Sequence, residues 1–326
     1  MKTKIIICTL LLSITVYSQD AAFTQFNAVS LYFNPGYAGS EGSPRLAASY
    51  GNSWESQHQS AYISYDQVVS RLHGGVGLIA YNHHYKPKYD LAYSNVFYCG
   101  LAYAAKFNLS SKLAISPAIK IGYRRDDNYF PEFLYGSIAP MNYISKYKQN
   151  IDISLGFVIN TKKLHLGLAV DHLNEPKIYS YFGGMRLGRK YVGQFGYTFQ
   201  KNNTSNFSIT PSLMYQIYQM RNIEQSYTYY TAPLRANISF RYKFAVIGTG
   251  INGGNTYNFL LGYYSKKMMI GYSYERYLST NFYNYDRHEL SVRYIIAPKK
   301  DEKDVNQTKD SKRYKLFRKN KKILQT

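Results

Sequence analysis

The chain has 326 residues, a net charge of +21 and an aromatic content of 17%, with 37 tyrosines. So many aromatic residues exclude a disordered chain. Beyond the N-terminus no apolar run approaches the ~18 residues that a membrane helix needs, which excludes a helical membrane bundle.

The N-terminus resembles a secretory signal. A basic start precedes an apolar stretch over residues 5–16, which predicts a signal peptide at residues 1–18. Cys8 would leave with the signal, so Cys99 would be alone and the mature chain would form no intramolecular disulfide. Exported proteins rarely meet nucleic acid. We therefore expect no nucleic-acid partner, and anionic lipid headgroups, acidic glycans or an acidic protein surface instead.

Residues 19–44 precede the first predicted strand. We expect this segment to lie at the periplasmic side. Its stretch from Asn34 to Ser40 can fold into the periplasmic mouth or the lumen of a barrel as a plug.

Residues 45–296 show a two-residue alternation almost throughout. In residues 151–160, for example, one face carries Ile, Ile, Leu, Phe and Ile, and the other carries Asp, Ser, Gly, Val and Asn. Such unlike faces are typical of a strand. Fourteen segments of this kind occur, near residues 45–51, 59–66, 74–82, 90–107, 111–124, 150–160, 162–171, 190–201, 205–219, 228–241, 243–250, 256–265, 267–277 and 286–296.

The connections between these segments are alternately short and long, as in outer-membrane barrels. The sequence therefore predicts an all-β fold: a transmembrane antiparallel β-barrel of about fourteen strands in the outer membrane, with both ends in the periplasm. A secreted β-sandwich would alternate too, but tyrosine and phenylalanine clusters near the strand ends favour an interfacial girdle.

Five basic residues are predicted to line the lumen: Lys120, Arg124, Arg235, Arg241 and Arg293. They can pack a polar interior through paired charges, or they can favour anions in a channel.

The tail, residues 297–326, holds eleven basic and four acidic residues. We expect a solvated, disordered periplasmic tail. Binding of this tail to acidic partners is the alternative.

Few residues suggest catalysis or metal binding. His83 and His84 are adjacent, so their rings point to opposite sides of an extended chain, and we interpret them as loop histidines. His165, Asp171 and His172 share a strand and its end, and a carboxylate that orients a histidine is a catalytic device. However, the sequence contains no Gly-x-Ser-x-Gly elbow, no Walker motif and no metal-type cysteine spacing. We expect no enzyme, no metal and no cofactor.

Several short motifs carry a family resemblance. Phe23-Thr24-Gln25-Phe26 and the stretch Asn34 to Ser40 resemble the opening of the PorP/SprF family of Bacteroidetes outer-membrane proteins. Residues 52–54, 74–77, 171–176 and 288–292 resemble later motifs of that family in the same order. The residues that carry the resemblance are Asn34, Pro35, Tyr37, Gly39, Trp54, His172, Leu173, Asn174, Pro176, His288 and Glu289.

The resemblance implies a component of the type IX secretion and gliding-motility system that is not an enzyme. Members serve either as a core partner of the periplasmic ring or as a dedicated partner that helps to export and anchor a secreted surface protein, an adhesin with a type B C-terminal sorting domain. The implied partners are this surface protein, other type IX secretion components and outer-membrane lipids. The alternative function is a transporter or porin for small or lipidic solutes.

The long external connections, residues 125–149 and 172–189, are the predicted partner-binding loops. Their candidate anchors are aromatic: Tyr129, Phe130, Phe133, Tyr135, Tyr179, Tyr181 and Phe182. The alternative is that these rings only pack the loops on one another.

Overall fold

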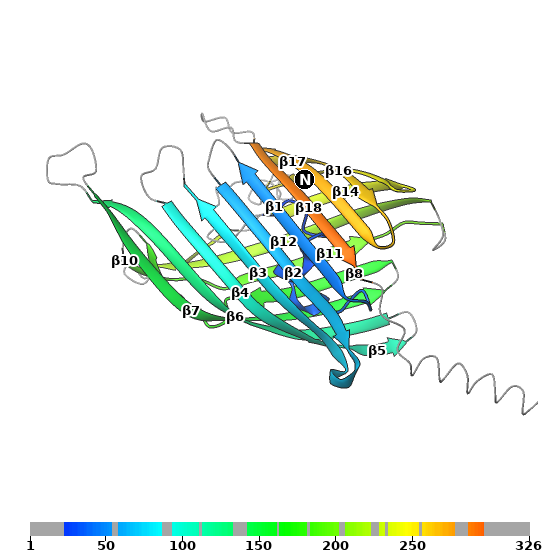
Figure 1. Ribbon diagram of the computed structural model, residues 1–326, viewed down its shortest axis with the longest axis horizontal. Coiled ribbons are helices and arrows are strands. Elements are labelled where there is room, and N and C mark those ends of the chain that lie inside the picture. Colours follow the sequence, from blue (N-terminus) through cyan, green and yellow to red (C-terminus); the bar gives the residue numbers. More distant parts are fainter. Residues whose placement is uncertain are drawn as a thin grey trace, which may run out of the picture.

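The computed structural model describes residues 23–53, 58–86, 93–110, 113–132, 142–161, 163–180, 183–201, 206–222, 228–231, 234–253, 256–277 and 286–296. These residues form a closed barrel whose antiparallel strands run obliquely around its axis (Figure 1). The predicted signal peptide, the basic tail and Trp54 lie outside the described residues.

Eighteen strand segments among the described residues make the wall. They are β1 (Arg45–Ser53), β2 (His58–Val69), β3 (Gly74–Tyr85), β4 (Tyr93–Ala105), β5 (Phe107–Ser110), β6 (Leu113–Glu132), β7 (Asn142–Thr161), β8 (Leu164–Asp171), β9 (Lys177–Ser180), β10 (Gly183–Arg186), β11 (Lys190–Tyr197), β12 (Phe207–Asn222), β13 (Thr228–Thr231), β14 (Leu234–Tyr242), β15 (Ala245–Asn252), β16 (Thr256–Tyr264), β17 (Met268–Tyr277) and β18 (Asp286–Ile295).

These segments form fourteen barrel strands, because four of them continue a neighbour: β5 continues β4, β9 continues β8, β10 leads into β11 and β13 leads into β14. The barrel closes where β1 pairs with β18, from Arg45 opposite Ile295 to Asn52 opposite His288. The predicted fold, an antiparallel barrel of fourteen strands, is confirmed.

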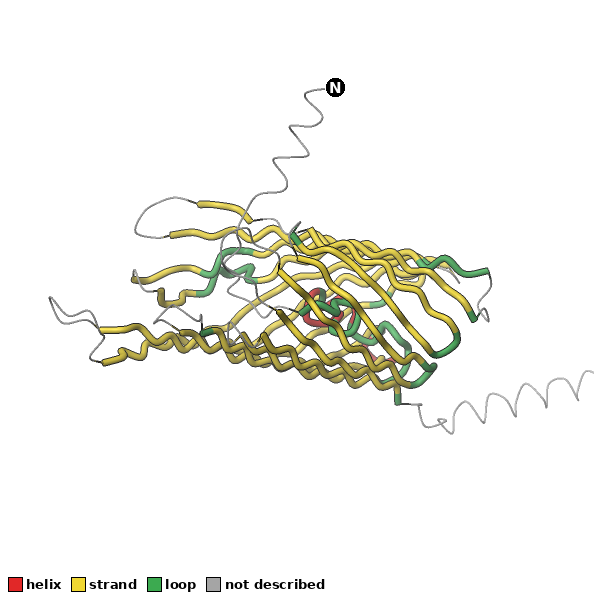
Figure 2. The backbone as a smooth tube through the Cα atoms, turned by 90° about the horizontal axis from the view of Figure 1, so that it is seen from above, coloured by secondary structure: helices red, strands yellow, loops and turns green. Residues whose placement is uncertain are grey.

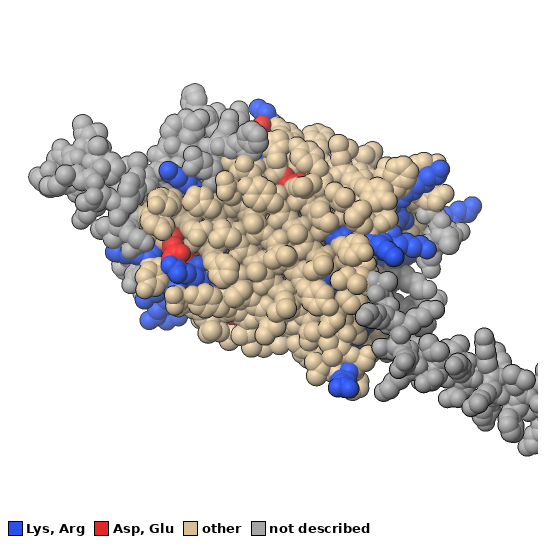
Figure 3. All heavy atoms as spheres, in the orientation of Figure 1, with Lys and Arg blue, Asp and Glu red and all other residues tan. Residues whose placement is uncertain are grey.

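The two faces of the wall differ as the alternation predicts. On β7, Leu155 is 43% exposed on the outside, whereas Ser154 is fully buried on the inside. Exposed leucine, isoleucine, phenylalanine and tyrosine side chains recur around the outer surface. On the face shown in Figure 3, charged side chains gather mainly at the two ends of the barrel. Such an apolar band between polar ends is the surface that lipid covers. No helix among the described residues is long and apolar enough to cross a membrane.

Strands β6 and β7 continue well beyond their predicted ends and are 20 residues long each. At ~3.3 Å per residue this length is about 66 Å, so even tilted strands extend past an apolar band of ~25 Å. In the added part, Arg125 lies on the outer face and pairs with Asp127 at 3.0 Å. Outward side chains in this part do not contact lipid, so they need not be apolar. The backbone ladder therefore continues without the apolar alternation.

The lumen contains an N-terminal plug, which we define as residues 23–42. It includes the one-turn helix α2 (Ser30–Phe33) and the 3-10 helix η1 (Pro35–Tyr37). Figure 2 shows this helical part enclosed by the strands. Phe23 and Val29 are fully buried. The ring of Tyr32 meets the wall edge-to-face at Tyr81, with centroids 5.1 Å apart. The hydrophobic core therefore lies inside the barrel, between the plug and the wall.

Candidate functional site: the plugged lumen

Asn34 ties the plug to the wall of the barrel. Its side-chain oxygen accepts the backbone N–H of Gly36 at 2.8 Å and so caps η1, which begins with Pro35. Its amide nitrogen donates to the carbonyls of Phe157 at 3.3 Å and Leu168 at 3.1 Å. One buried side chain thus orders the 3-10 helix and fixes it to β7 and β8.

Gly39 meets a glycine of the wall. It has φ +66°, and its N–H donates to Asp66 at 2.8 Å. A Cβ on Gly39 would lie 2.8 Å from the Cα of Gly75, and a Cβ on Gly75 would overlap the carbonyl of Ala38. The glycine-rich start of β3 therefore serves a close backbone approach of the plug.

Arg45 joins the plug to the start of the barrel. Its Nε donates to Asp66 at 2.7 Å, and its Nη2 donates to the carbonyl of Tyr37 at 3.1 Å. Burial raises the pKa of Tyr37 to about 12, so its hydroxyl remains protonated at cellular pH.

Asp171 is the centre of a buried charge cluster. Its carboxylate accepts Lys120 at 3.0 Å and pairs with Lys190 at 3.0 Å, and all three side chains are at most 5% exposed. Lys120 also donates to the carbonyl of Tyr32 in the plug at 3.3 Å. Buried ions require such partners, so the cluster links β6, β8 and β11 with the plug.

The remaining predicted lumen cations also have partners inside the barrel. Arg124 pairs with Asp126 at 2.8 Å, Arg235 donates to the carbonyl of Phe23, Arg293 pairs with Glu41 at 3.1 Å, and Arg241 lies over the ring of Tyr264 at 4.7 Å. This arrangement fits a packed polar interior.

The motif from His172 to Pro176 is a strand interruption. The N–H of Leu173 donates to the carbonyl of Ile153 at 2.8 Å. The Asn174 side chain accepts the N–H of Ile153 at 3.1 Å and donates to the carbonyl of Ile151 at 2.6 Å. An amide side chain thus replaces backbone in the ladder. The expectation that a long external loop begins here is wrong, because β9 resumes after Pro176.

The predicted histidine–carboxylate pair takes other partners. His172 has φ 58°, is buried and bonds Asp152 at 2.9 Å. His165 contacts Asn160, while Asp171 bonds the two lysines. The structure therefore does not bring His165 and Asp171 together as a catalytic pair.

Glu289 holds the first residues of the plug. It accepts the N–H of Thr24 at 2.6 Å, the N–H of Gln25 at 3.2 Å and the hydroxyl of Ser49 at 3.1 Å. The neighbouring His288 points to the other face of β18 and bonds the hydroxyl of Tyr272 at 2.7 Å. Only one of these two motif residues thus contributes to the lumen.

The predicted anchor residues are only partly described. Tyr129 lies in β6 and stacks on Tyr93 with centroids 4.2 Å apart. Phe130 lies in β6 and Tyr179 in β9, so both belong to strands and not to loops. The other candidates, Phe133, Tyr135, Tyr181 and Phe182, lie outside the described residues.

His83 and His84 belong to β3, so their interpretation as loop histidines is wrong. His83 is buried and bonds His58 at 3.1 Å and Ser60 at 3.0 Å. Within the described ranges, no group of three or more His, Cys, Asp or Glu residues could hold a metal ion.

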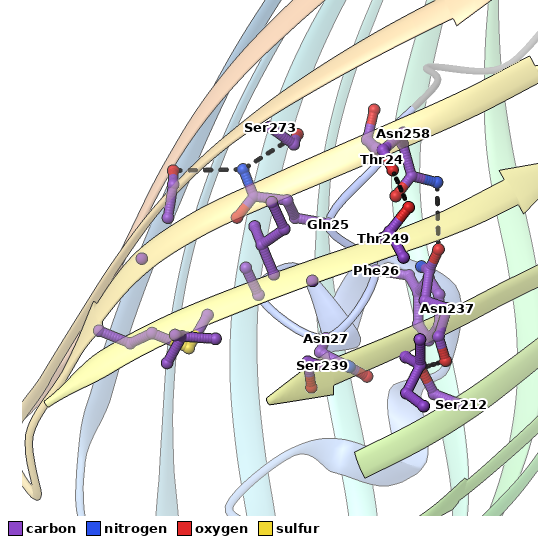
Figure 4. A pocket seen from close by; sticks show the side chains of 18 of the residues that line it. Thr24, Gln25, Phe26, Asn27, Ser212, Asn237, Ser239, Thr249, Asn258 and Ser273 are labelled. Carbon is purple, nitrogen blue, oxygen red and sulfur yellow. Dashed lines mark hydrogen bonds between the residues drawn. The ribbon is translucent and has the colours of Figure 1, made fainter. Parts of the chain in front are cut away.

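A cavity of about 120 Å³ remains between the plug and the opposite wall (Figure 4). Gln25 points into this region from the plug and donates to Ser273 at 3.3 Å, and Asn258 donates to Asn237 at 3.1 Å on the wall. The plug therefore fills the lumen unevenly.

The sequence analysis missed several residues that hold the plug. Asp66 and Glu275 bind Gly39 and Thr24, respectively. Their signal was weak: each is a single acidic residue at an inward position of its strand.

The apolar outer surface, the closed ladder and a lumen filled by the plug, its hydrophobic core and buried ion pairs together define a plugged β-barrel of the outer membrane. Residues 15–294 match the family described as "Type IX secretion system membrane protein PorP/SprF". The chain belongs to this family. The family is a class of secretion-system membrane proteins and not a class of enzymes, and membership implies that the chain works with other components of that system.

No curated protein is detectably similar in sequence. Among solved structures, the toluene transporter TbuX of Ralstonia pickettii is similar over 83% of this chain and 94% of its own, with 10% identity and a TM-score of 0.48. The toluene transporter TodX of P. putida has 10% identity, covers 83% and 95%, and has a TM-score of 0.48. A FadL homologue of Pseudomonas aeruginosa has 11% identity, covers 78% and 89%, and has a TM-score of 0.44. Similarity at this level does not bear on function.

Proposed function

We propose that this barrel helps to export and anchor a secreted surface protein, an adhesin with a type B C-terminal sorting domain. The observation that carries the proposal is the projection of β6 and β7 beyond the apolar band, in a barrel whose own lumen is occupied by the plug. Such projecting strands supply a surface on which a large client can rest, while the plug leaves the barrel no wide passage of its own.

The client would contact the outer ends of β6, β7, β9 and β10. The aromatic candidates belong to these strands and their connections, and aromatic side chains commonly dominate binding energy. The Tyr129–Tyr93 stack supports this assignment, because it gives the neighbouring strands β4 and β6 a rigid aromatic surface.

The experiment replaces residues 133–141 with a Gly/Ser linker of equal length in the full chain. We expect the barrel to assemble and the surface protein to be lost to the medium or retained in the cell. The matched control replaces residues 278–285, which connect β17 and β18 on the same end of the barrel. Normal surface display in the first variant would contradict the proposed docking region.

A transporter or porin for small or lipidic solutes is the second candidate. The cavity of about 120 Å³ beside the plug favours it, because this space lies along β12 and β14–β17 inside the lumen. Conductance of the full chain in planar bilayers tests it, with a variant lacking residues 23–42 as the open reference. Transport would be favoured by two results together. The full chain would conduct as well as the variant, and deletion of the gene would leave surface display unchanged.

A further inference from the structure

Basic residues gather at one end of the barrel, where the strands are joined by short turns. We call Arg71, Lys106, Lys163, Lys201, Lys243, Lys266 and Lys267 the basic ring; they lie in or beside the connections β2–β3, β4–β5, β7–β8, β11–β12, β14–β15 and β16–β17. Short turns of outer-membrane barrels face the periplasm. The ring therefore lies at the inner leaflet of the membrane.

The ring has no balancing acidic residues nearby. The described residues of these connections include no Asp or Glu. Glu41 is the nearest acidic side chain of the plug, and it already pairs with Arg293 at 3.1 Å and Arg45 at 3.6 Å. Within the part of the chain that the structure describes, no acidic side chain therefore balances the ring; Lys163 donates to the carbonyl of Gln200 at 3.3 Å, and Arg71, Lys201, Lys243, Lys266 and Lys267 are exposed.

The opposite end of the barrel is different. There Arg125 pairs with Asp127 at 3.0 Å, and Arg276 pairs with Asp286 at 3.5 Å. In the view of Figure 3, basic side chains (blue) lie beside acidic ones (red) toward the left end. At the right-hand end, where Figure 1 places β5, basic side chains appear without acidic ones. The described connections at the turn end thus carry basic residues without acidic ones, whereas the opposite end carries both kinds.

Exposed aromatic side chains lie directly beside the basic ring. Lys106 precedes Phe107, which is 53% exposed, and Lys243 lies between Tyr242 and Phe244, each 60% exposed. Aromatic side chains of this kind mark the level of the lipid headgroups. Lysines beside them reach the phosphates with their ammonium groups while their stems lie along apolar surface.

We propose that the basic ring binds the phosphate headgroups of anionic phospholipids in the inner leaflet. Lipid is the occupant that the pattern favours over an acidic protein, because the basic residues lie at connections all around this end and exposed aromatic side chains lie beside four of these connections: Phe107, Phe199, Tyr242, Phe244 and Tyr263. The proposal rests on the outer-membrane location and is independent of the proposed secretion function.

The test uses the full chain in lipid nanodiscs that contain phosphatidylglycerol and phosphatidylethanolamine in equal amounts. Native mass spectrometry then counts the lipids that stay bound when the protein is released from the nanodiscs. We expect the wild type to retain phosphatidylglycerol in excess. The variant Lys201→Gln, Lys243→Gln, Lys266→Gln, Lys267→Gln should lose this excess.

The matched control removes the same charge at the opposite end, through Lys86→Gln, Lys146→Gln, Lys148→Gln and Lys177→Gln, and should keep the excess. The basic tail is present in all three proteins, so it does not cause a difference between them. A second measurement needs no variant: the wild-type excess should fall as salt is raised.

Equal retention of the two lipids by the wild type would overturn the proposal, as would equal loss in both variants. If the turn-end variant kept its phosphatidylglycerol but lost a periplasmic protein that co-purifies with the wild type, the occupant would be an acidic protein and the proposal would be wrong.

Discussion

The backbone N–H of Thr24 donates to the carboxylate of Glu289 across 2.6 Å, so the last strand of the barrel binds the first described turn of the chain. The same carboxylate accepts the hydroxyl of Ser49 on β1 and lies 3.9 Å from Arg287. Plug, first strand and last strand therefore meet at one acidic side chain.

Replacement of Glu289 should release the start of the plug. We expect Glu289→Ala to lower the free energy of unfolding by about 3–5 kcal/mol, because Arg287 would lose a buried acidic partner. Glu289→Gln should cost less, since one side-chain oxygen can still accept. Urea unfolding in vesicles measures both. The control is Glu41→Gln at the exposed end of the plug, and a shift as large as that of Glu289→Ala would contradict the central role of Glu289.

Asn174→Ala should loosen the strand interruption between β8 and β9. Both side-chain hydrogen bonds to β7 would be lost, and we expect a cost of about 1–3 kcal/mol. Hydrogen exchange at the amide of Ile153 is the direct measurement and should accelerate. Asn174→Asp keeps the acceptor for this amide and should protect it partly. Asn108→Ala in the exposed β5 is the control; unchanged exchange in Asn174→Ala would refute the role of the side chain.

Charge on the outer face should destabilise the barrel more than charge in the open part of the lumen. Leu155→Arg faces lipid and should cost about 2–4 kcal/mol if it lies near the midplane. Ser239→Arg points toward the cavity beside the plug and should be milder. Ser154, the inward neighbour of Leu155, is fully buried and has no space for an arginine, so Ser239 is the better site for the inward charge. The temperature at which the folded band disappears on a gel ranks the variants; an equal shift would argue against the assigned faces.

A tag inserted between residues 136 and 137 should be labelled on intact cells, because the β6–β7 connection lies at the end opposite the short turns. A tag at the C-terminus should stay unlabelled until the outer membrane is opened. An insertion after Asp127 would interrupt the ladder between β6 and β7, where Asp127 pairs with Tyr147. Labelling of the C-terminal tag alone on intact cells would show that the topology is the reverse of the one predicted.

Sequence reasoning predicted the barrel because lipid imposes a two-residue pattern on strands such as β7, where Leu155 faces outward and Ser154 inward. It failed where lipid ends: Arg125 and Asp127 break the pattern although the strand continues.

The lumen contacts could not be predicted in detail. Lys190 lies directly opposite Asp171 in the β8–β11 ladder, and Lys120 reaches Asp171 across β7 because the wall curves. Thr24 and Glu289 are 265 positions apart and meet only through closure of the sheet. No local sequence pattern indicates a contact between residues so far apart in the chain.

The position of Glu289 also constrains the order of assembly. The seam between β1 and β18 is the last ladder that a barrel built in chain order can form, and Glu289 stands in that seam with Thr24 already bound. Contacts between the two ends of a chain form slowly, because a long loop must close first. A chain that sealed without its N-terminal segment would leave the Glu289 carboxylate in a water-filled lumen without two of its donors, so we expect such a barrel to form but to be less stable.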